Sequence, residues 1–228
     1  MKINIQGEGA FASTLVTLNP GDKFVSESGA MYRSSANVDI DVTKKSRGKG
    51  GILGGLKRLL SGENFFFSTY ETNDGQPGEV GLAPTHQGEI ELIEMDGTTD
   101  WMCAGGSYLA SSADLEIDTE FQGFIRGAFS GEAPFFLRVS GPGPLLVTAF
   151  GRIVTINVKD EIIVDTGHVV AFEESLDYEL TKAGSSWIQS WLAGEGVVLR
   201  FKGQGKLMVQ SHNPNEFGGT LGPMLPTR

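Results

Sequence analysis

The chain has 228 residues, of which 39% are hydrophobic and 20% are charged, a balance typical of a folded globular protein. Its formal net charge of −10 excludes general nucleic-acid binding, because an acidic surface repels a polyphosphate. A single cysteine cannot form an internal disulfide and favours a reducing compartment, so we expect a cytoplasmic protein without a secretory signal or a membrane-spanning helix.

The first third of the chain contains three predicted elements in succession. Residues 37–42 alternate apolar and charged side chains, which predicts a strand with one solvated face. Residues 54–63 carry leucines at helical spacing and reach Gly62, which predicts a short helix with a glycine stop. The dense apolar run at 65–70 predicts a strand covered on both faces.

The same succession occurs twice more along the chain. An alternating segment, a helix-like segment and an apolar run lie at 114–118, 123–132 and 134–139. In the last third, residues 166–179, 185–195 and 197–201 follow the same order. The helix-like pieces are too short to be stable alone in water, so packing has to hold them.

Three segments can be aligned directly: residues 28–41, 105–118 and 166–179. Each has a glycine at the same place, namely Gly29, Gly106 and Gly167, which predicts turns or bulges with positive φ. The pattern predicts a mainly β, single-domain protein of three pseudo-repeated antiparallel units with short helices, at about 1–86, 87–152 and 153–216, followed by a C-terminal tail. We expect the units to pack around a pseudo-threefold axis, because one unit alone covers its apolar faces poorly.

Several stretches resemble the altered-inheritance-of-mitochondria protein family over nearly the whole chain. GGLKRLLSGE at 54–63 and VDTGHVVA at 164–171 are the most specific of them. The resemblance implies a β-rich fold of the short double-stranded β-helix group, like the tryptophan RNA-binding attenuation protein, and a ring-like or trimeric assembly. A mitochondrial role and RNA binding do not transfer, because the chain lacks a targeting segment and function depends on sites rather than on folds.

No catalytic constellation is predicted. Cys103 lies between apolar neighbours and is expected to be buried and inert. Asp165, beside Gly167, is the best acid–base candidate, although a turn-stabilising role is favoured over catalysis. The histidines are far apart and predict no metal site: His86, His168 and His212. No phosphate-binding loop matches, so no cofactor is predicted.

One segment differs from the rest in charge. From Thr43 to Gly62 the chain has no acidic residue and six basic ones: Lys44, Lys45, Arg47, Lys49, Lys57 and Arg58. The remainder has 12 basic and 28 acidic side chains, a net charge of −16. The segment is interpreted as a solvated loop, as a contact with a neighbouring subunit, or as a contact with anionic lipid; the subunit is favoured over the membrane, because the acidic remainder opposes approach to anionic lipid.

These observations predict a non-enzymatic structural or interaction protein that forms homo-oligomers, as a trimer or a ring, through its β-rich units. The alternative is a small-molecule or peptide binding module with a pocket between the units. An enzyme that uses Asp165 and a peripheral membrane protein that uses residues 44–60 are the less favoured hypotheses.

Overall fold

The computed structural model describes residues 1–7, 9–43, 67–120, 136–182 and 197–226. Nearly all regular structure in these ranges consists of strands, and the pairs of neighbouring strands are antiparallel. The prediction of a mainly β, antiparallel protein is therefore confirmed. Four short helical elements complete the described part: η1 (Gly9–Phe11), η2 (Thr166–His168), α3 (Pro214–Leu221) and η3 (Gly222–Met224).

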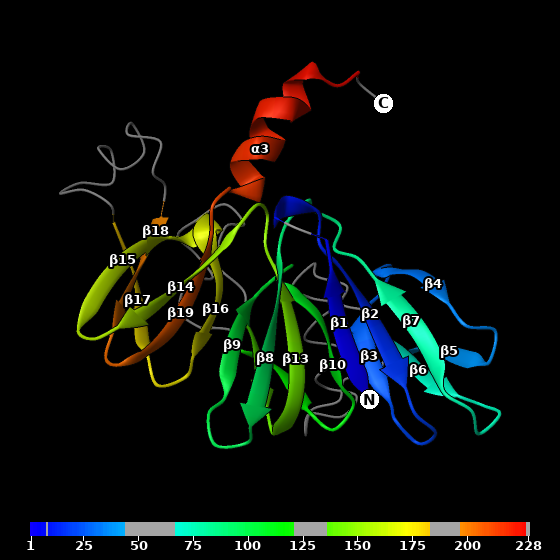
Figure 1. Ribbon diagram of the computed structural model, residues 1–228. Helices are drawn as coiled ribbons and strands as arrows, with labels where there is room; N and C mark the ends of the chain where they lie inside the picture. Colours follow the sequence, from blue (N-terminus) through cyan, green and yellow to red (C-terminus); the bar gives the residue numbers. More distant parts are fainter. Residues whose placement is uncertain (8, 44–66, 121–135, 183–196, 227–228) are drawn as a thin grey trace.

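The described strands form four sheets, which we number in their order across the molecule (Figure 1). The first contains, in order, β1 (Lys2–Gln6), β2 (Ser13–Leu18), β7 (Gly78–Leu82) and β4 (Met31–Ser34). The second contains β5 (Val38–Thr43), β6 (Phe67–Thr72), β3 (Phe24–Glu27), β10 (Tyr108–Ser112), β13 (Pro142–Thr148) and β8 (Ile90–Asp96). The third contains β11 (Glu116–Glu120), β12 (Phe136–Ser140), β9 (Trp101–Ala104), β16 (Val169–Glu173), β19 (Gly205–Gln210) and β14 (Ile153–Val158). The fourth contains β15 (Glu161–Asp165), β18 (Val197–Lys202) and β17 (Asp177–Lys182).

Three hydrophobic cores lie between successive sheets. The first core joins Val16 and Leu82 of the first sheet to residues of the second sheet such as Phe24. The second core lies between the second and third sheets, and the third core lies between the third and fourth. The cores therefore form a row that is open at both ends (Figure 1), rather than a closed arrangement around one threefold axis as predicted.

Two strands in the middle of the inner sheets, β3 and β9, bury side chains on both of their faces. In β3, Phe24 enters the first core and its neighbour Val25 enters the second. In β9, Cys103 enters the second core and Met102 enters the third. This two-sided burial explains why Phe24 and Val25, and likewise Trp101 to Cys103, are uninterrupted apolar runs.

One strand-pairing pattern occurs in β2–β7, again in β8–β13 and again in β14–β19. In each set of six, the fifth strand pairs with the second and the fourth, and the sixth pairs with the first and the third. The third strand of each set has a register shift against the sixth strand at the same place: between Met31 and Arg33, between Tyr108 and Ala110, and between Val169 and Ala171.

Two local features differ from the sequence expectations. The apolar residues of β5 are unequally covered, since Val38 is 7% exposed whereas Val42 is 58% exposed. The C-terminal tail contains a helix, α3, that begins after Asn213, whose side chain accepts hydrogen bonds from two backbone amides of the first turn. Asparagine at the N-cap followed by proline is a known helix start, so this helix had a readable signal.

Candidate interaction surfaces

The basic segment falls outside the described residues. Its six members are Lys44, Lys45, Arg47, Lys49, Lys57 and Arg58, and the structure describes nothing between residues 44 and 66. The three predicted short helices at 54–63, 123–132 and 185–195 also fall outside the described residues.

The three aligned glycines do not share one conformation. Gly29 has a φ of +93° and Gly106 has a φ of +81°, and an added Cβ would meet no atom within 4 Å at either place. Gly167 is not among the glycines with positive φ, so the expectation of a left-handed turn is wrong there. Gly167 lies in η2 against Asn213, whose amide nitrogen would be 2.3 Å from an added Cβ.

Asp165 stabilises the turn that follows β15. Its Oδ1 accepts a hydrogen bond from the backbone N–H of Gly167 at 2.9 Å, and a second from Nδ2 of Asn213 at 3.3 Å. This is the Asx role that the sequence favoured over catalysis. The carboxylate thereby connects η2 to the segment that leads into α3.

Cys103 and the histidines have structural surroundings. Cys103 is 0% exposed, and burial raises the pKa of its thiol to about 12, so the reactive thiolate is suppressed. His168 contacts the backbone carbonyl of Gln210 through Nδ1 at 2.7 Å, and the rings of His86 and His212 both pack on Phe150. Within the described ranges, no group of three His, Cys, Asp or Glu side chains is arranged to hold a metal ion.

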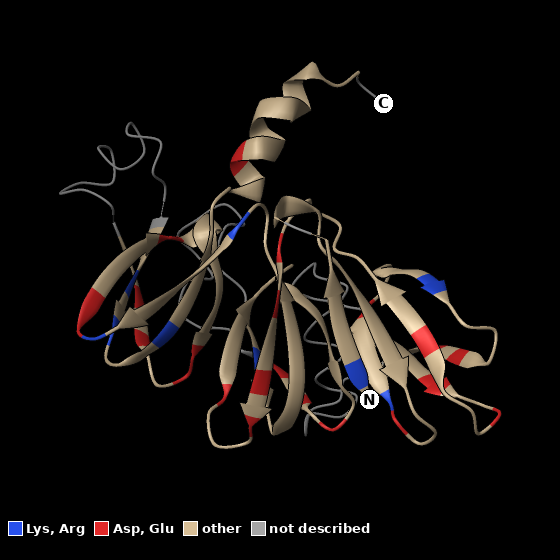
Figure 2. Cartoon of the chain, viewed as in Figure 1, with Lys and Arg blue, Asp and Glu red and all other residues tan. Residues whose placement is uncertain are grey.

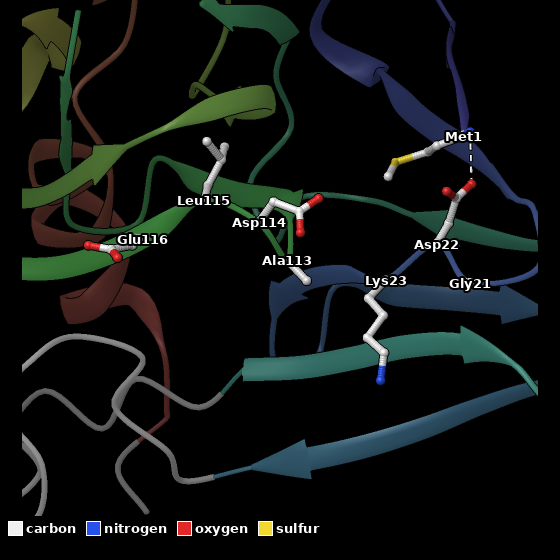
Figure 3. Close-up of a pocket in the computed structure, with 8 residues that line it drawn as sticks. All are labelled: Met1, Gly21, Asp22, Lys23, Ala113, Asp114, Leu115 and Glu116. Carbon is white, nitrogen blue, oxygen red and sulfur yellow. Dashed lines mark ion pairs between the residues drawn. The ribbon is translucent and has the colours of Figure 1, made fainter. Parts of the chain in front are cut away.

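A polar hollow of about 590 Å³ lies where the N-terminus and the β2–β3 turn meet the β10–β11 turn (Figure 3). Its rim includes Asp22, whose Oδ2 is 2.8 Å from the N-terminal amino group of Met1. On the other side lie Ala113, Asp114 and Glu116. The hollow is therefore located between the first and second of the predicted units.

Two sheet edges at opposite ends of the molecule form the second candidate surface (Figure 1). The first sheet ends at β4 and the fourth sheet ends at β15. Among the described strands, β4 pairs only with β7, and β15 pairs only with β18. An edge strand presents unpaired backbone N–H and C=O groups, so each of these edges can accept another strand.

Apolar side chains on both edges are exposed, although their counterparts in the inner sheets are buried. Tyr32 in β4 is 50% exposed, whereas Leu109 and Val170, at the same place in β10 and β16, are both 0% exposed. Ile163 in β15 is also 50% exposed, whereas Val25 and Met102, at the same place in β3 and β9, are 1% and 2% exposed. The two outer edges therefore expose the positions that the inner sheets bury.

We call the three six-strand sets, β2–β7, β8–β13 and β14–β19, pairing sets. Each inner sheet contains one junction, where a strand of one pairing set pairs with a strand of the next. In the second sheet β3 pairs with β10, and Ser26 lies opposite Ala110. In the third sheet β9 pairs with β16, and Cys103 lies opposite Ala171. Ser26 and Cys103 hold the same position in their strands, as do Ala110 and Ala171, so both junctions have the same register.

At both junctions one more backbone hydrogen bond forms just beyond the paired strand residues. Ala113 N–H donates to the carbonyl of Lys23 at 3.0 Å, and Glu174 N–H donates to the carbonyl of Asp100 at 2.9 Å. The second junction also has a charged cluster, in which Nη2 of Arg138 lies 2.8 Å from Oδ2 of Asp100 and 3.0 Å from Oε2 of Glu174. Arg138 therefore bridges two strands that belong to different pairing sets.

Neither open edge was identified from the sequence. The aligned segments contain the signal for one edge, because Tyr32 aligns with the apolar residues Leu109 and Val170, whereas Ile163 lies before the aligned segment 166–179. The alignment does not indicate which of three equivalent positions has a neighbour, since that depends on how many units stand in the row. Sheet order was therefore needed to find the edges.

Comparison with known proteins shows what the chain resembles. Residues 3–212 match the family model described as Mitochondrial biogenesis AIM24. An uncharacterized protein of Streptococcus pyogenes serotype M6 (strain ATCC BAA-946 / MGAS10394), M6_Spy0233, is 31% identical over 232 residues, which are 100% of this chain and 92% of the relative. The crystal structure of protein SPYM3_0169 from Streptococcus pyogenes has a TM-score of 0.80 at 30% identity, and the match covers 98% of this chain and 99% of that one.

In the part of the chain that the structure describes, no helix has the length and apolar character needed to span a bilayer.

Proposed function

The chain belongs to the family described as Mitochondrial biogenesis AIM24, and we propose that it is a non-enzymatic structural protein that assembles with other copies of itself. The side chains that suggested chemistry have structural surroundings in the described ranges: Cys103 is buried with a raised thiol pKa, and Asp165 stabilises a turn. These contacts favour a structural role over catalysis by either residue.

The observation that carries this proposal is the incompleteness of the two outer sheets. Counting only the strands that the structure describes, the inner sheets have six each, whereas the first sheet has four and the fourth has three. Each inner sheet joins strands from two pairing sets, and each outer sheet holds strands from one set plus, in the first sheet, β1. The row of sheets thus ends on both sides with strands that have places for neighbours.

The recurring pairing pattern supports the interpretation of three repeated units. The sets β2–β7, β8–β13 and β14–β19 span residues 13–82, 90–148 and 153–210, close to the predicted units. Proteins built from such repeats bury apolar surface between neighbours and need protection at the terminal units. Assembly with further copies would provide that protection.

Size-exclusion chromatography with light scattering, in low and in high salt, tests the proposal. Acidic side chains are present in all four sheets (Figure 2), and the net charge of −10 makes copies repel each other. We expect an oligomer whose fraction increases with salt, because salt screens this repulsion. A strict monomer in both conditions, at every concentration, would contradict self-assembly.

The cellular compartment is part of the same proposal. The one cysteine of the chain is fully buried at Cys103, as suits a protein that does not depend on disulfides. We propose the cytoplasm, and cell fractionation with an antibody against the chain would locate it.

A second candidate function is a small-molecule or peptide binding module, and the hollow of about 590 Å³ near Asp22 and Asp114 favours it. Its volume falls within the usual range for ligand pockets of roughly 300–1,000 Å³. A thermal-shift screen with a panel of metabolites tests this function, with Ala113→Arg to fill the hollow and Gln204→Arg as a surface control. A ligand that stabilises the wild type and the control but not Ala113→Arg would support it, whereas a panel without effect on the wild type would count against it.

A further inference from the structure

We propose that a second copy of this chain is the partner of the open edges, and that β4 of one copy pairs with β15 of the next. The inference rests on the proposed function, because it names the partner and the contact through which self-assembly occurs. The pairing is antiparallel and joins two different edges, so it is a head-to-tail contact.

The register follows from the two junctions inside the chain. Ser26 in β3, Cys103 in β9 and Val164 in β15 occupy the same position relative to the fifth strand of each set. In the third strand of each set, Arg33, Ala110 and Ala171 follow the shared register shift. Since Ser26 faces Ala110 and Cys103 faces Ala171, Val164 of one copy faces Arg33 of the next.

The neighbouring pairs follow from the same alignment. Ile163 lies opposite Ser34 of the next copy, as Val25 lies opposite Ser111 inside the second sheet. The extra backbone hydrogen bond of the inner junctions has its counterpart as well. It runs from the N–H of Ala36 to the carbonyl of Glu161, in place of Ala113 to Lys23 and Glu174 to Asp100.

The contact also explains why large apolar side chains are exposed on these strands. Tyr32 and Ile163, each 50% exposed, would acquire the surroundings of Leu109 and Met102, which are 0% and 2% exposed. Burial of their apolar area stabilises the contact and offsets part of the cost of association. The new backbone hydrogen bonds provide the specificity of register.

A single chain cannot make this contact with itself, because β4 and β15 lie at opposite ends of the row (Figure 1). The combined sheet has the order β17, β18, β15, β4, β7, β2 and β1, with β4, β7, β2 and β1 supplied by the second copy. A head-to-tail contact produces a ring when its rotation closes and a filament when it does not. The second copy therefore adds three further cores to the row and leaves one open edge at each end.

Crosslinking of opposite residues tests the register. Ser34→Cys and Ile163→Cys are made in separate chains, purified, mixed and oxidised, since opposed Cα atoms in antiparallel strands lie roughly 4.5–5.5 Å apart, within reach of a disulfide. The native Cys103 is retained, because it is fully buried and its thiol pKa is raised to about 12. A register control combines Ser34→Cys with Glu161→Cys, a diagonal pair that is roughly 7–8 Å apart.

We expect a crosslinked dimer in the Ser34→Cys and Ile163→Cys mixture, and loss of that band in the Glu161→Cys mixture. A dimer formed by either single variant alone would overturn the inference, because it shows like edges pairing. Oligomers in light scattering without the expected crosslink would overturn the inference and leave the proposed function standing. A monomer under all conditions would overturn both.

A charge placed on the edge gives an independent test. Ile163→Lys adds a lysine where the next copy would cover it, and Val154→Lys, at 52% exposure on the open edge of β14, is the matched control. We expect loss of the oligomer with Ile163→Lys and retention with Val154→Lys, while circular dichroism of both matches the wild type. Equal behaviour of the two variants would overturn the inference.

Discussion

At the scale of single residues, positive φ decides where glycine is required. Gly29 has a φ of +93° with open space around its α-carbon, so a substitution there is strained by the backbone and not by a clash. We expect Gly29→Ala to lower the free energy of unfolding by about 1–2 kcal/mol, and Gly29→Asn to lower it less, since asparagine tolerates this region. Urea unfolding measures both, and equal losses for Ala and Asn would contradict the argument.

Gly167 is a residue-scale contrast to Gly29. A larger residue is excluded at Gly167 because an added Cβ would clash with the side-chain amide of Asn213, and not because of the backbone φ. Glycine at these two aligned positions is therefore required for two different physical reasons. A sequence alignment shows the shared glycine but cannot distinguish backbone strain from a close side-chain approach.

Burial of a carboxylate makes stability depend on pH at Glu27. Desolvation at the end of β3 raises the pKa of Glu27 above its ordinary value of 4.5, so the folded state binds this proton more tightly than the unfolded state. Its contribution to stability is therefore fully present below the ordinary pKa and is lost as the pH rises through the folded pKa.

The variant Glu27→Gln isolates this effect. We expect the decrease in unfolding midpoint from acidic to neutral pH to become smaller in Glu27→Gln than in the wild type. Glu91→Gln, which removes the charge of an exposed glutamate on β8, is the matched control. A wild-type profile retained in Glu27→Gln would show that its carboxylate does not contribute.

At the scale of elements, α3 depends on its cap. The helix has eight residues, which is too short to be stable through helix propensity alone, and none of them is buried. Oδ1 of Asn213 accepts hydrogen bonds from the backbone N–H groups of Asn215 at 3.0 Å and of Glu216 at 3.4 Å. We expect Asn213→Ala to destabilise the helix by about 1 kcal/mol and to accelerate amide exchange in residues 214–221.

The strands should not respond to this substitution, because α3 stands outside the three cores. Unchanged exchange in β9 and β12 serves as the internal control. Asn213→Ser keeps a side-chain oxygen as the cap acceptor without placing a second carboxylate beside Asp165, and should restore slow exchange in the helix. Fast exchange in the helix with Asn213→Ser would contradict the capping argument.

The elements also show what the sequence could predict and why. The apolar run at 65–70 predicted a strand covered on both faces, and in β6 Phe67 lies in the second core and Tyr70 in the first. The alternation at 37–42 predicted a strand with one covered face, yet Ile40 is 42% exposed among the described residues. The local sequence pattern determines the secondary structure, whereas the burial of a strand depends on segments that are distant in the sequence.

The open edges lie beyond what local pattern can predict. Tyr32, Leu109 and Val170 all present apolar carbon surface, and the position of their strand in the row separates the exposed first residue from the two buried ones. The same holds for Ile163 beside Val25 and Met102. Pairing between sets is a property of the whole arrangement, so a candidate site made of sheet edges requires the topology.

At the scale of the whole molecule, sharing of sheets connects the three cores. The second sheet faces the first and second cores, and the third sheet faces the second and third cores. Loss of an inner sheet would therefore expose two cores at once, whereas loss of the fourth sheet exposes one. Amide exchange should follow this order, with β9 and β12 protected more strongly than β15 and β17.

The dependence of amide protection on protein concentration distinguishes an edge strand that pairs with another copy from one that does not. If β4 and β15 pair between copies, amide protection in both strands rises with protein concentration by mass action, because the assembled form covers their backbone N–H groups. The strands β8 and β14 are edge strands of the second and third sheets. They should keep the same amide protection at every concentration. Exchange measured by mass spectrometry over a dilution series resolves these strands. A rise confined to β8 and β14, or no rise in any strand while light scattering shows oligomers, would place the contact elsewhere on the molecule.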